Sequence, residues 1–430
     1  MKKTVLLISL LIIAGLWGTD AYVVNSTSRT LSKIDLENGN VNNAFAVIGL
    51  YANRVVIDED FAYVVNSGDN SIQKIDKNSG ITVTNINVED FSNPYDILIA
   101  DGFAYVTGLF TAKVYKIDLT TNTVTDEIAV GNSPEGMAVF DDKLYVANTN
   151  YVYPNYNPGT VSVIDLNDFS LITTLDVELN PQAMTVADEK IHIVCTGNYI
   201  DIFGKICVVD PATDIVENTL DIGGSPANIV SSVNGRVYLG DGMGAGVFVY
   251  DSASYEIIHS PGSPFSEGGS SITTNAENIA VVDAEDWNSN STVRFYDLNE
   301  ELVSSYEVGI GAVSIALEEQ EIYTEDLDLN SFDHKLKNFP NPVRDFTTIS
   351  FDLTTEHTES TEIIIYNVKG QEVDILSCDY AQDTAKDYDQ DFARNTSVVW
   401  DASDFASGIY FYKLNINGKT AASSKMVLIE

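Results

Sequence analysis

Residues that commonly carry catalysis are few and scattered in this chain. None of its histidines has the spacing of a Ser/His/Asp set or of a zinc site; they are His192, His259, His334 and His357. The Gly-rich stretch 240–246 joins two predicted strands and no helix follows it, unlike a phosphate-binding loop. The sequence therefore predicts no catalytic set and no metal site, and it favours a role other than catalysis.

Aromatic residues gather in three polar segments that are typical of long loops. Residues 148–159 hold Tyr151, Tyr153 and Tyr156, residues 197–204 hold Tyr199 and Phe203, and residues 283–291 hold Trp287. Aromatic rings beside Asn and Asp suit stacking on sugars or recognition of proteins, because each ring offers a large contact area at a low entropy cost. The alternative is that these rings pack beneath their own loops.

The chain is strongly acidic, with 63 Asp and Glu against 23 Lys and Arg and a formal net charge of −40. Such a field repels nucleic acid and anionic membrane surfaces within about a Debye length, so neither is an expected partner. The negative charge is compatible with weak calcium binding at Asp58, Glu59 and Asp60, although a calcium site needs about six converging oxygens. No other cofactor is expected, and a solvated acidic surface explains the charge equally well.

The first 18 residues have the pattern of a signal peptide, with a basic start and an apolar run over 5–16 that is too short for a membrane span. No later segment predicts a transmembrane helix. The three cysteines Cys195, Cys207 and Cys378 leave at least one thiol without an intramolecular partner. Cys195 and Cys207 fall on adjacent predicted strands, where either a disulfide or two separate core thiols fits the sequence.

An internal repeat organises the chain up to about residue 326. A run that begins with Tyr or its counterpart recurs every 40–47 residues, at Tyr22, Tyr63, Tyr105, Tyr145, His192, Tyr238 and Ala280. An apolar residue followed by Asp comes after each copy, at Asp35, Asp76, Asp118, Asp165, Asp210, Asp251 and Asp297. Each period holds about four short runs rich in Val, Ile, Tyr and Thr, which predict strands. Four antiparallel strands repeated at this period are typical of a β-propeller blade.

The repeat predicts an all-β fold, a seven-bladed β-propeller over residues 19–326. The innermost strands centre near Val55, Ile97, Met137, Met184, Ile229, Ile272 and Ile315. The last of these has no complete blade of its own, so we expect it to pair with the N-terminal strands from Tyr22 to Ile48. Residues 322–324 are an alternative for the place given to residues 22–25.

In such a propeller, the polar residues at the start of the innermost strands line the mouth of the axial channel. They are Asn53, Arg54, Asp96, Glu135, Gln182, Asn228, Ser271 and Ser314. A ring of water-bridged polar groups is one interpretation. The other is an enzyme site that uses Asp96 and Glu135. The mostly acidic turns after the innermost strands, such as 58–60 and 141–142, are expected on the opposite face.

The repeated strand resembles the YVTN family of β-propellers over residues 20–326, through residues 22–25 (YVVN), 63–66 (YVVN) and 145–148 (YVAN). The resemblance implies an exported or surface-layer protein. Most members of that family have no assigned chemistry.

Residues 327–337 have the composition of a linker, and the alternating runs of residues 338–430 predict a small immunoglobulin-like β-sandwich. The motifs of this region resemble the type A sorting domain of the type IX secretion system; they are 339–342 (FPNP), 365–371 (IYNVKGQ), 400–401 (WD), 407–413 (SGIYFYK) and 425–429 (KMVLI). The resemblance implies the secretion machinery as a partner and a secreted or outer-surface location. The acidic stretch 378–394 departs from the family pattern.

Three functions remain open from the sequence. The first is an exported binding protein for a glycan, a protein or the cell envelope. The second is a lactonase- or lyase-like propeller enzyme with a metal or carboxylate site in the axial channel. The third is a surface-layer-like structural protein. The aromatic loops, the export signals and the lack of a catalytic cluster favour the first.

Overall fold

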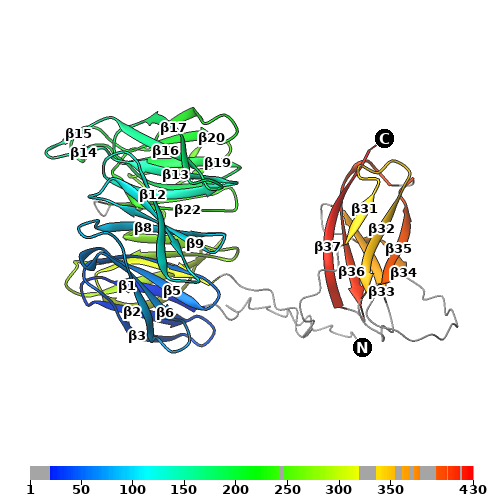
Figure 1. Ribbon diagram of the computed structural model, residues 1–430, viewed down its shortest axis with the longest axis horizontal. Coiled ribbons are helices and arrows are strands. Elements are labelled where there is room, and N and C mark those ends of the chain that lie inside the picture. Colours follow the sequence, from blue (N-terminus) through cyan, green and yellow to red (C-terminus); the bar gives the residue numbers. More distant parts are fainter. Residues whose placement is uncertain are drawn as a thin grey trace, which may run out of the picture. The chain divides into compact units, whose positions relative to one another are not determined.

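The computed structural model describes residues 20–242, 246–318, 336–353, 361–367, 372–377, 394–403, 405–416 and 419–429. The predicted signal peptide, most of the linker, residues 322–324, Cys378 and most of the acidic stretch lie outside these ranges. The chain divides into two compact units, one ending at Gln320 and the other beginning at Glu321. The regular secondary structure of the described residues is β-strand (Figure 1), as predicted, apart from one short 3-10 helix at Ser67–Asp69. No helix among them is long and apolar enough to cross a membrane.

The described part of the first unit forms seven four-stranded antiparallel sheets. One sheet combines both ends of the unit, β3 (Asn40–Val47), β2 (Thr30–Asp35), β1 (Asp20–Asn25) and β30 (Ala312–Leu317). The other six run from the innermost strand outward as follows: β4 (Ala52–Ile57), β5 (Phe61–Asn66), β6 (Ser71–Asp76), β7 (Thr82–Asn87); β8 (Pro94–Ala100), β9 (Phe103–Gly108), β10 (Lys113–Asp118), β11 (Thr123–Ala129); β12 (Pro134–Phe140), β13 (Lys143–Asn148), β16 (Gly159–Asp165), β17 (Ser170–Val177); β18 (Pro181–Ala187), β19 (Lys190–Cys195), β20 (Lys205–Asp210), β21 (Ile215–Asp221); β22 (Pro226–Val233), β23 (Arg236–Asp241), β24 (Val247–Asp251), β25 (Ile257–His259); β26 (Ser271–Thr274), β27 (Asn278–Asp283), β28 (Asn290–Asp297), β29 (Leu302–Ile310).

The innermost strands form a closed ring. In the order β4, β8, β12, β18, β22, β26 and β30, each strand contacts the next, and β30 contacts β4. Closure depends on the antiparallel pairing of β30 with β1, in which Ile315 lies opposite Val23. The predicted pairing of the two chain ends is therefore confirmed.

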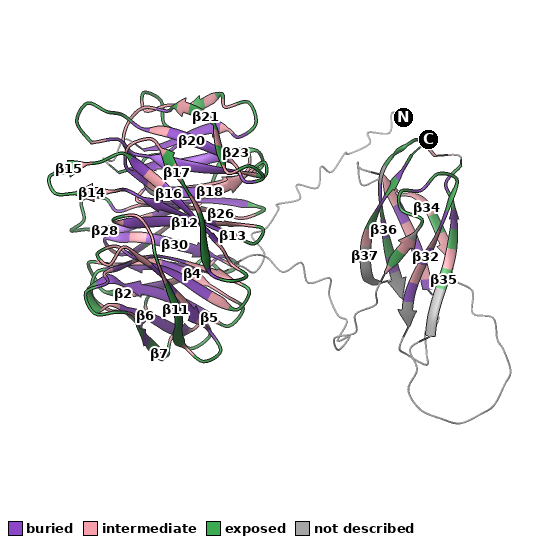
Figure 2. Cartoon of the chain, turned by 45° about the horizontal axis from the view of Figure 1, so that its top comes forward, coloured by how far each residue is buried: buried purple, intermediate pink, exposed green. Residues whose placement is uncertain are grey.

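Burial is high in the second strand of each sheet and low in the outermost strand. The second strand of a sheet lies between neighbouring sheets on both faces, and β5 is buried along nearly its whole length, whereas β11 is exposed along nearly all of its length (Figure 2). Strands covered on both faces have continuous apolar sequences rather than alternating ones. The core consists of layers between neighbouring sheets, as where Val65 and Ile72 pack with Ile97 and Val106.

The repeated Asn at the end of the second strand is a structural residue. Asn66 accepts the backbone N–H of Gly49 at 2.9 Å and donates through Nδ2 to Gln73 Oε1 at 3.1 Å. A Cβ at Gly49 would lie 2.5 Å from the Asn66 Cγ, so the incoming loop passes too close for a side chain. Asn66 thus links the loop that arrives from the preceding sheet to the second and third strands of its own sheet.

The repeated Asp shapes the turn between the third and fourth strands. Asp251 Oδ1 accepts the amides of Ala253 and Ser254, at 3.2 and 2.7 Å, and the Ser254 hydroxyl at 2.7 Å. The hydrogen bonds from Ser254 hold the pKa of Asp251 below its usual value. Asp35, Asp76, Asp118, Asp210 and Asp297 make related turns. These carboxylates therefore specify turns.

His192 and the paired cysteines belong to the core. His192 is fully buried, its Nδ1 lies 2.7 Å from the Tyr250 hydroxyl, and burial lowers its pKa to about 4. His192 is therefore a structural residue of the core. Cys195 and Cys207 lie on the adjacent strands β19 and β20 as buried free thiols, with their sulfurs 3.9 Å apart.

The second unit contains two antiparallel sheets that share one core. One sheet has the order β31 (Lys337–Phe339), β32 (Phe346–Leu353), β35 (Arg394–Asp401). The other has the order β34 (Glu372–Ser377), β33 (Thr361–Asn367), β36 (Gly408–Ile416), β37 (Lys419–Leu428). Ile349, Phe351 and Trp400 from the first sheet pack with Ile363 and Tyr412 from the second. Both described sheets contribute their apolar faces to this core.

Replacing Asp251 with Ala is expected to destabilise the protein by about 1 kcal/mol, because the amides and hydroxyl of the turn lose their acceptor. The measurement is the thermal midpoint at pH 7. Glu256→Ala removes the same charge from the same turn region and should have a much smaller effect, since no side-chain hydrogen bond of Glu256 is seen among the described residues. Equal effects of the two variants would contradict the structural role of the Asp.

Candidate functional site

Three tyrosine rings from two neighbouring loops come together on the first unit. Tyr151 and Tyr156 lie opposite each other in a small hairpin of β14 (Tyr151–Val152) and β15 (Asn155–Tyr156), with ring centroids 4.8 Å apart. The Tyr156 ring lies 6.3 Å from the ring of Tyr199, which belongs to the loop between β19 and β20. We call Tyr151, Tyr156 and Tyr199 the tyrosine ledge. Figure 1 shows the β14–β15 hairpin projecting from the edge of its unit.

Asparagine side chains hold both loops in place. Asn198 Oδ1 accepts the amides of Ile200, Asp201 and Ile202 at 2.9–3.0 Å, which fixes the turn beside Tyr199. Asn150 donates to the carbonyl of Pro158 at 2.9 Å and closes the base of the hairpin. The ledge is therefore organised before any ligand arrives, which reduces the entropy cost of binding.

The other predicted aromatic residues do not join the ledge. Tyr153 is 85% exposed at the hairpin tip, and Phe203 is 61% exposed. Trp287 is half exposed on the loop between β27 and β28, and it makes no ring contact with the ledge among the described residues. The structure thus brings together three of the six aromatic residues that the sequence singled out.

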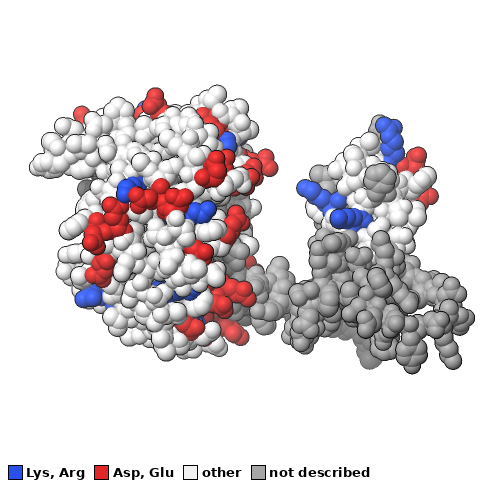
Figure 3. Space-filling view, viewed as in Figure 1, with Lys and Arg blue, Asp and Glu red and all other residues white. Residues whose placement is uncertain are grey.

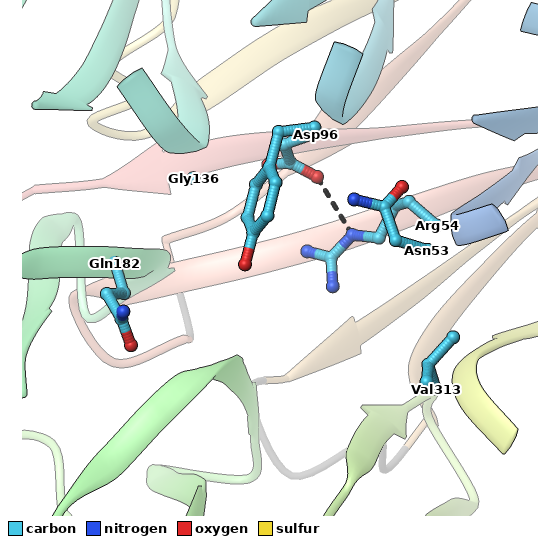
Figure 4. Close-up of a pocket in the computed structure, with 7 residues that line it drawn as sticks. Asn53, Arg54, Asp96, Gly136, Gln182 and Val313 are labelled. Carbon is cyan, nitrogen blue, oxygen red and sulfur yellow. Dashed lines mark ion pairs between the residues drawn. The ribbon is translucent and has the colours of Figure 1, made fainter. Parts of the chain in front are cut away.

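A narrow pocket lies at the start of the innermost strands. It is lined by Asn53, Arg54, Tyr95, Asp96, Gly136, Gln182 and Val313, from β4, β8, β12, β18 and β30 (Figure 4). The free space is about 20 Å³, which suits a water molecule rather than a sugar ring. We call this pocket the channel mouth.

The predicted ring of polar residues is only partly at the mouth. Asn53, Arg54, Asp96 and Gln182 line it, whereas Glu135 does not. Ser271 and Ser314 are buried and accept the amides of Ile315 and Val55, at 3.2 and 3.1 Å, and neither lines this pocket. The side chain of Asn228 lies outside the described residues.

Asp96 joins three neighbouring strands at the mouth. Its Oδ1 lies 2.8 Å from Arg54 Nε, and its Oδ2 accepts the amide of Met137 at 3.0 Å. Its own amide donates to Thr107 Oγ1, whose hydroxyl donates to the carbonyl of Glu135, each at 3.0 Å. The carboxylate therefore has partners from both sides of the mouth, and its negative charge is balanced by Arg54.

Glu135 is the acid whose protonation is most perturbed in this region. Burial, and then the nearby charge of Asp96, raises the pKa of Glu135 to about 8, and its Oε2 has no hydrogen-bond partner among the described residues. At pH 7 the group is therefore mostly a neutral acid. It lies close enough to the ledge for its negative form to add to the effect of burial in raising the pKa of Tyr199.

The ledge and the mouth are physically connected. The hydroxyl of Tyr199 donates to Gln182 Oε1 at 3.2 Å, and Gln182 lines the mouth. Thr196 Oγ1 donates to the same oxygen at 2.8 Å. A ligand on the rings would thus lie beside polar groups and a guanidinium. This arrangement could not be found from sequence, since the two loops belong to different repeats.

The described residues contain no gathering of three His, Cys, Asp or Glu side chains suited to a metal ion. Asp58 uses its carboxylate within its own turn, accepting the amide of Phe61 and the hydroxyl of Tyr63, both at 2.7 Å. Weak calcium binding at Asp58, Glu59 and Asp60 stays a prediction. Figure 3 shows that Asp and Glu outnumber Lys and Arg on the visible side of the first unit.

Residues 337–430 match the family of secretion system C-terminal sorting domains. This domain directs the chain through the type IX secretion system to the cell surface or the extracellular space. The match begins at the first residue of β31, one residue before the predicted start of the domain.

Solved structures similar to this chain are propeller-like. A chain of hydrazine synthase from Kuenenia stuttgartiensis has 12% identity and a TM-score of 0.50, with 63% of this chain and 96% of that chain covered. The WD40 domain of Neurospora crassa Pan2 has 12% identity and a TM-score of 0.48, covering 61% and 81%. BamB from Moraxella catarrhalis has 12% identity and a TM-score of 0.44, covering 76% and 89%. At such low identity the shared property is the fold alone. No curated protein matches the sequence.

Replacing Glu135 with Gln is expected to make stability less dependent on pH. Because the folded-state pKa is raised from 4.5 to about 8, the folded protein keeps a proton that the unfolded chain releases. The stability due to this proton is present below about pH 4.5 and is lost as the pH rises through 8, by at most on the order of 5 kcal/mol. Urea unfolding at pH 5 and pH 9 should show a smaller loss for the variant. A loss equal to that of the unchanged protein would mean that Glu135 titrates normally.

Proposed function

We propose that this chain is an exported glycan-binding protein, built as a seven-bladed β-propeller of the YVTN type with a removable immunoglobulin-like sorting domain. The convergence of Tyr151, Tyr156 and Tyr199 beside Gln182 carries this proposal. The C–H face of a sugar ring stacks on such rings, and nearby amide and hydroxyl groups can exchange hydrogen bonds with its hydroxyls.

The size of the channel mouth supports binding rather than catalysis. Its free space of about 20 Å³ cannot admit a glycosidic bond or a lactone ring. Glu135, which an acid–base mechanism would pair with Asp96, does not line the pocket. The enzyme hypothesis would require the mouth to open widely, against the hydrogen bonds that Asp96 makes to neighbouring strands.

A protein ligand is the second candidate, because the two loops also expose large apolar side chains. Ile200 is 82% exposed, and Tyr153 and Phe203 are also exposed. Exposed apolar side chains that cluster are typical of protein interfaces. Replacing Tyr153 and Ile200 with Ser should leave glycan binding intact and abolish binding to a protein partner, so the pair of substitutions distinguishes the two ligand classes.

Replacing Tyr156 with Ala is expected to weaken glycan binding about tenfold, because the central ring of the ledge is lost. A glycan array would identify a binding oligosaccharide, and titration calorimetry would measure its affinity. Tyr153→Ala is the matched control, because it removes the same ring from the tip of the same hairpin. Equal losses for the two variants, or no loss for Tyr156→Ala, would place the ligand elsewhere.

Ending the chain before Lys337 is expected to stop export across the outer membrane, since the sorting domain would be missing. In a host with type IX secretion, the shortened protein should accumulate in the periplasm, while the full chain reaches the surface or the medium. Cell fractionation with an antibody to the first unit would measure this. Surface delivery of the shortened chain would show that another segment carries the export signal.

A further inference from the structure

Arg54 is the one basic side chain among the residues that line the channel mouth. Its side chain is 31% exposed, so it is accessible to a ligand while being held by the fold. Figure 4 shows its guanidinium beside Asp96 and pointing into the pocket, with Gln182 on the other side of the pocket.

The ion pair of Arg54 leaves its terminal nitrogens available. The contact to Asp96 uses Nε, at 2.8 Å, and no described residue contacts Nη1 or Nη2 within bonding distance. Arg236 and Arg294 differ, since each uses a terminal nitrogen to bind a carboxylate. Two parallel N–H groups at the end of a guanidinium match the two oxygens of a carboxylate.

The surrounding charges do not prevent binding of an anion at the mouth. Asp96 is paired with Arg54 and with the Met137 amide, and Glu135 is mostly neutral at pH 7 because it is buried. The acidic turns that follow the innermost strands lie at the other ends of those strands. A strand of six residues is roughly 20 Å long, about twice the Debye length at physiological salt, so most of their repulsion is screened.

We propose that the glycan ligand is acidic, and that Arg54 binds the carboxylate of a uronic acid unit through Nη1 and Nη2 while a neighbouring unit stacks on the tyrosine ledge. This inference rests on the proposed function. Gln182 joins the two parts, because it lines the mouth and accepts the hydroxyl of Tyr199. A ligand of several sugar units is required, since the mouth itself is too narrow for a ring.

The test compares acidic oligosaccharides with their methyl esters, which keep the sugar rings and remove the charge. Tetrasaccharides of galacturonic, glucuronic and mannuronic acid would be titrated into the mature full chain by calorimetry. We expect at least one acid to bind about tenfold to a hundredfold more tightly than its ester. Arg54→Lys keeps a positive charge for Asp96 but removes the two parallel N–H groups, and it should reduce the preference for the acid over its ester.

A folding control accompanies this variant, because loss of Arg54 leaves Asp96 unpaired. Arg54→Gln combined with Asp96→Asn removes both charges together, and circular dichroism would establish that it is folded. It should bind acid and ester equally.

The outcomes separate the two proposals. Equal binding of acid and ester by the unchanged protein, or binding of neutral oligosaccharides alone, would overturn recognition of the carboxylate and leave the glycan proposal standing. Tighter binding of an oligoglutamate peptide than of any uronic acid would replace the glycan with a protein ligand. Failure to bind any oligosaccharide on a wide array would overturn both.

Discussion

Closure of the ring by the pairing of β30 with β1 is the constraint on which the first unit depends. A ring left open would expose the inner faces of two sheets, with their buried Val, Ile and Tyr side chains, to water. Closure also sets the spacing of the innermost strands, which hold one another through side chains. Ser314 accepts the amide of Val55, Ser271 accepts that of Ile315, and Asp96 accepts that of Met137. Of these residues Asp96 lines the mouth, so its carboxylate is held by the fold before it serves any ligand.

The repeat predicted those strands and turns that have the same surroundings in every sheet, because the same surroundings select the same residue types. Second strands are covered on both faces, so their apolar runs recur with the period, and the Asp of each third strand recurs because the same turn needs the same acceptor. The two ends of the first unit could be paired by counting inner strands. The short strand β31 was not predicted, because three residues are too few to show alternation.

The candidate site could be predicted only in part, since its geometry depends on contacts between different repeats. Tyr151, Tyr156 and Tyr199 were identified by residue type and loop length, but the same criteria included Trp287, which lies on another sheet. Glu135 and Asp96 appeared equivalent in the sequence. The structure separates them, because Asp96 faces a guanidinium at the mouth while Glu135 is buried without a charged partner and becomes a neutral acid.

Positive charges are scarce in the first unit, and Arg54 is unusual among them. Residues 20–318 contain 12 Lys and Arg against 42 Asp and Glu, and most of these cations bind carboxylates between strands or lie over aromatic rings. Such pairs keep an acidic protein compact by placing each cation where two elements meet. Arg54 pairs with Asp96 through Nε and not through its terminal nitrogens. One side chain therefore links two sheets and can also offer hydrogen-bond donors to a ligand. Because Asp96 is held by the Met137 amide, the ion pair keeps the guanidinium of Arg54 at the mouth. A ligand carboxylate would therefore meet a positive charge that is already in place, and the tyrosine ledge would add contact area.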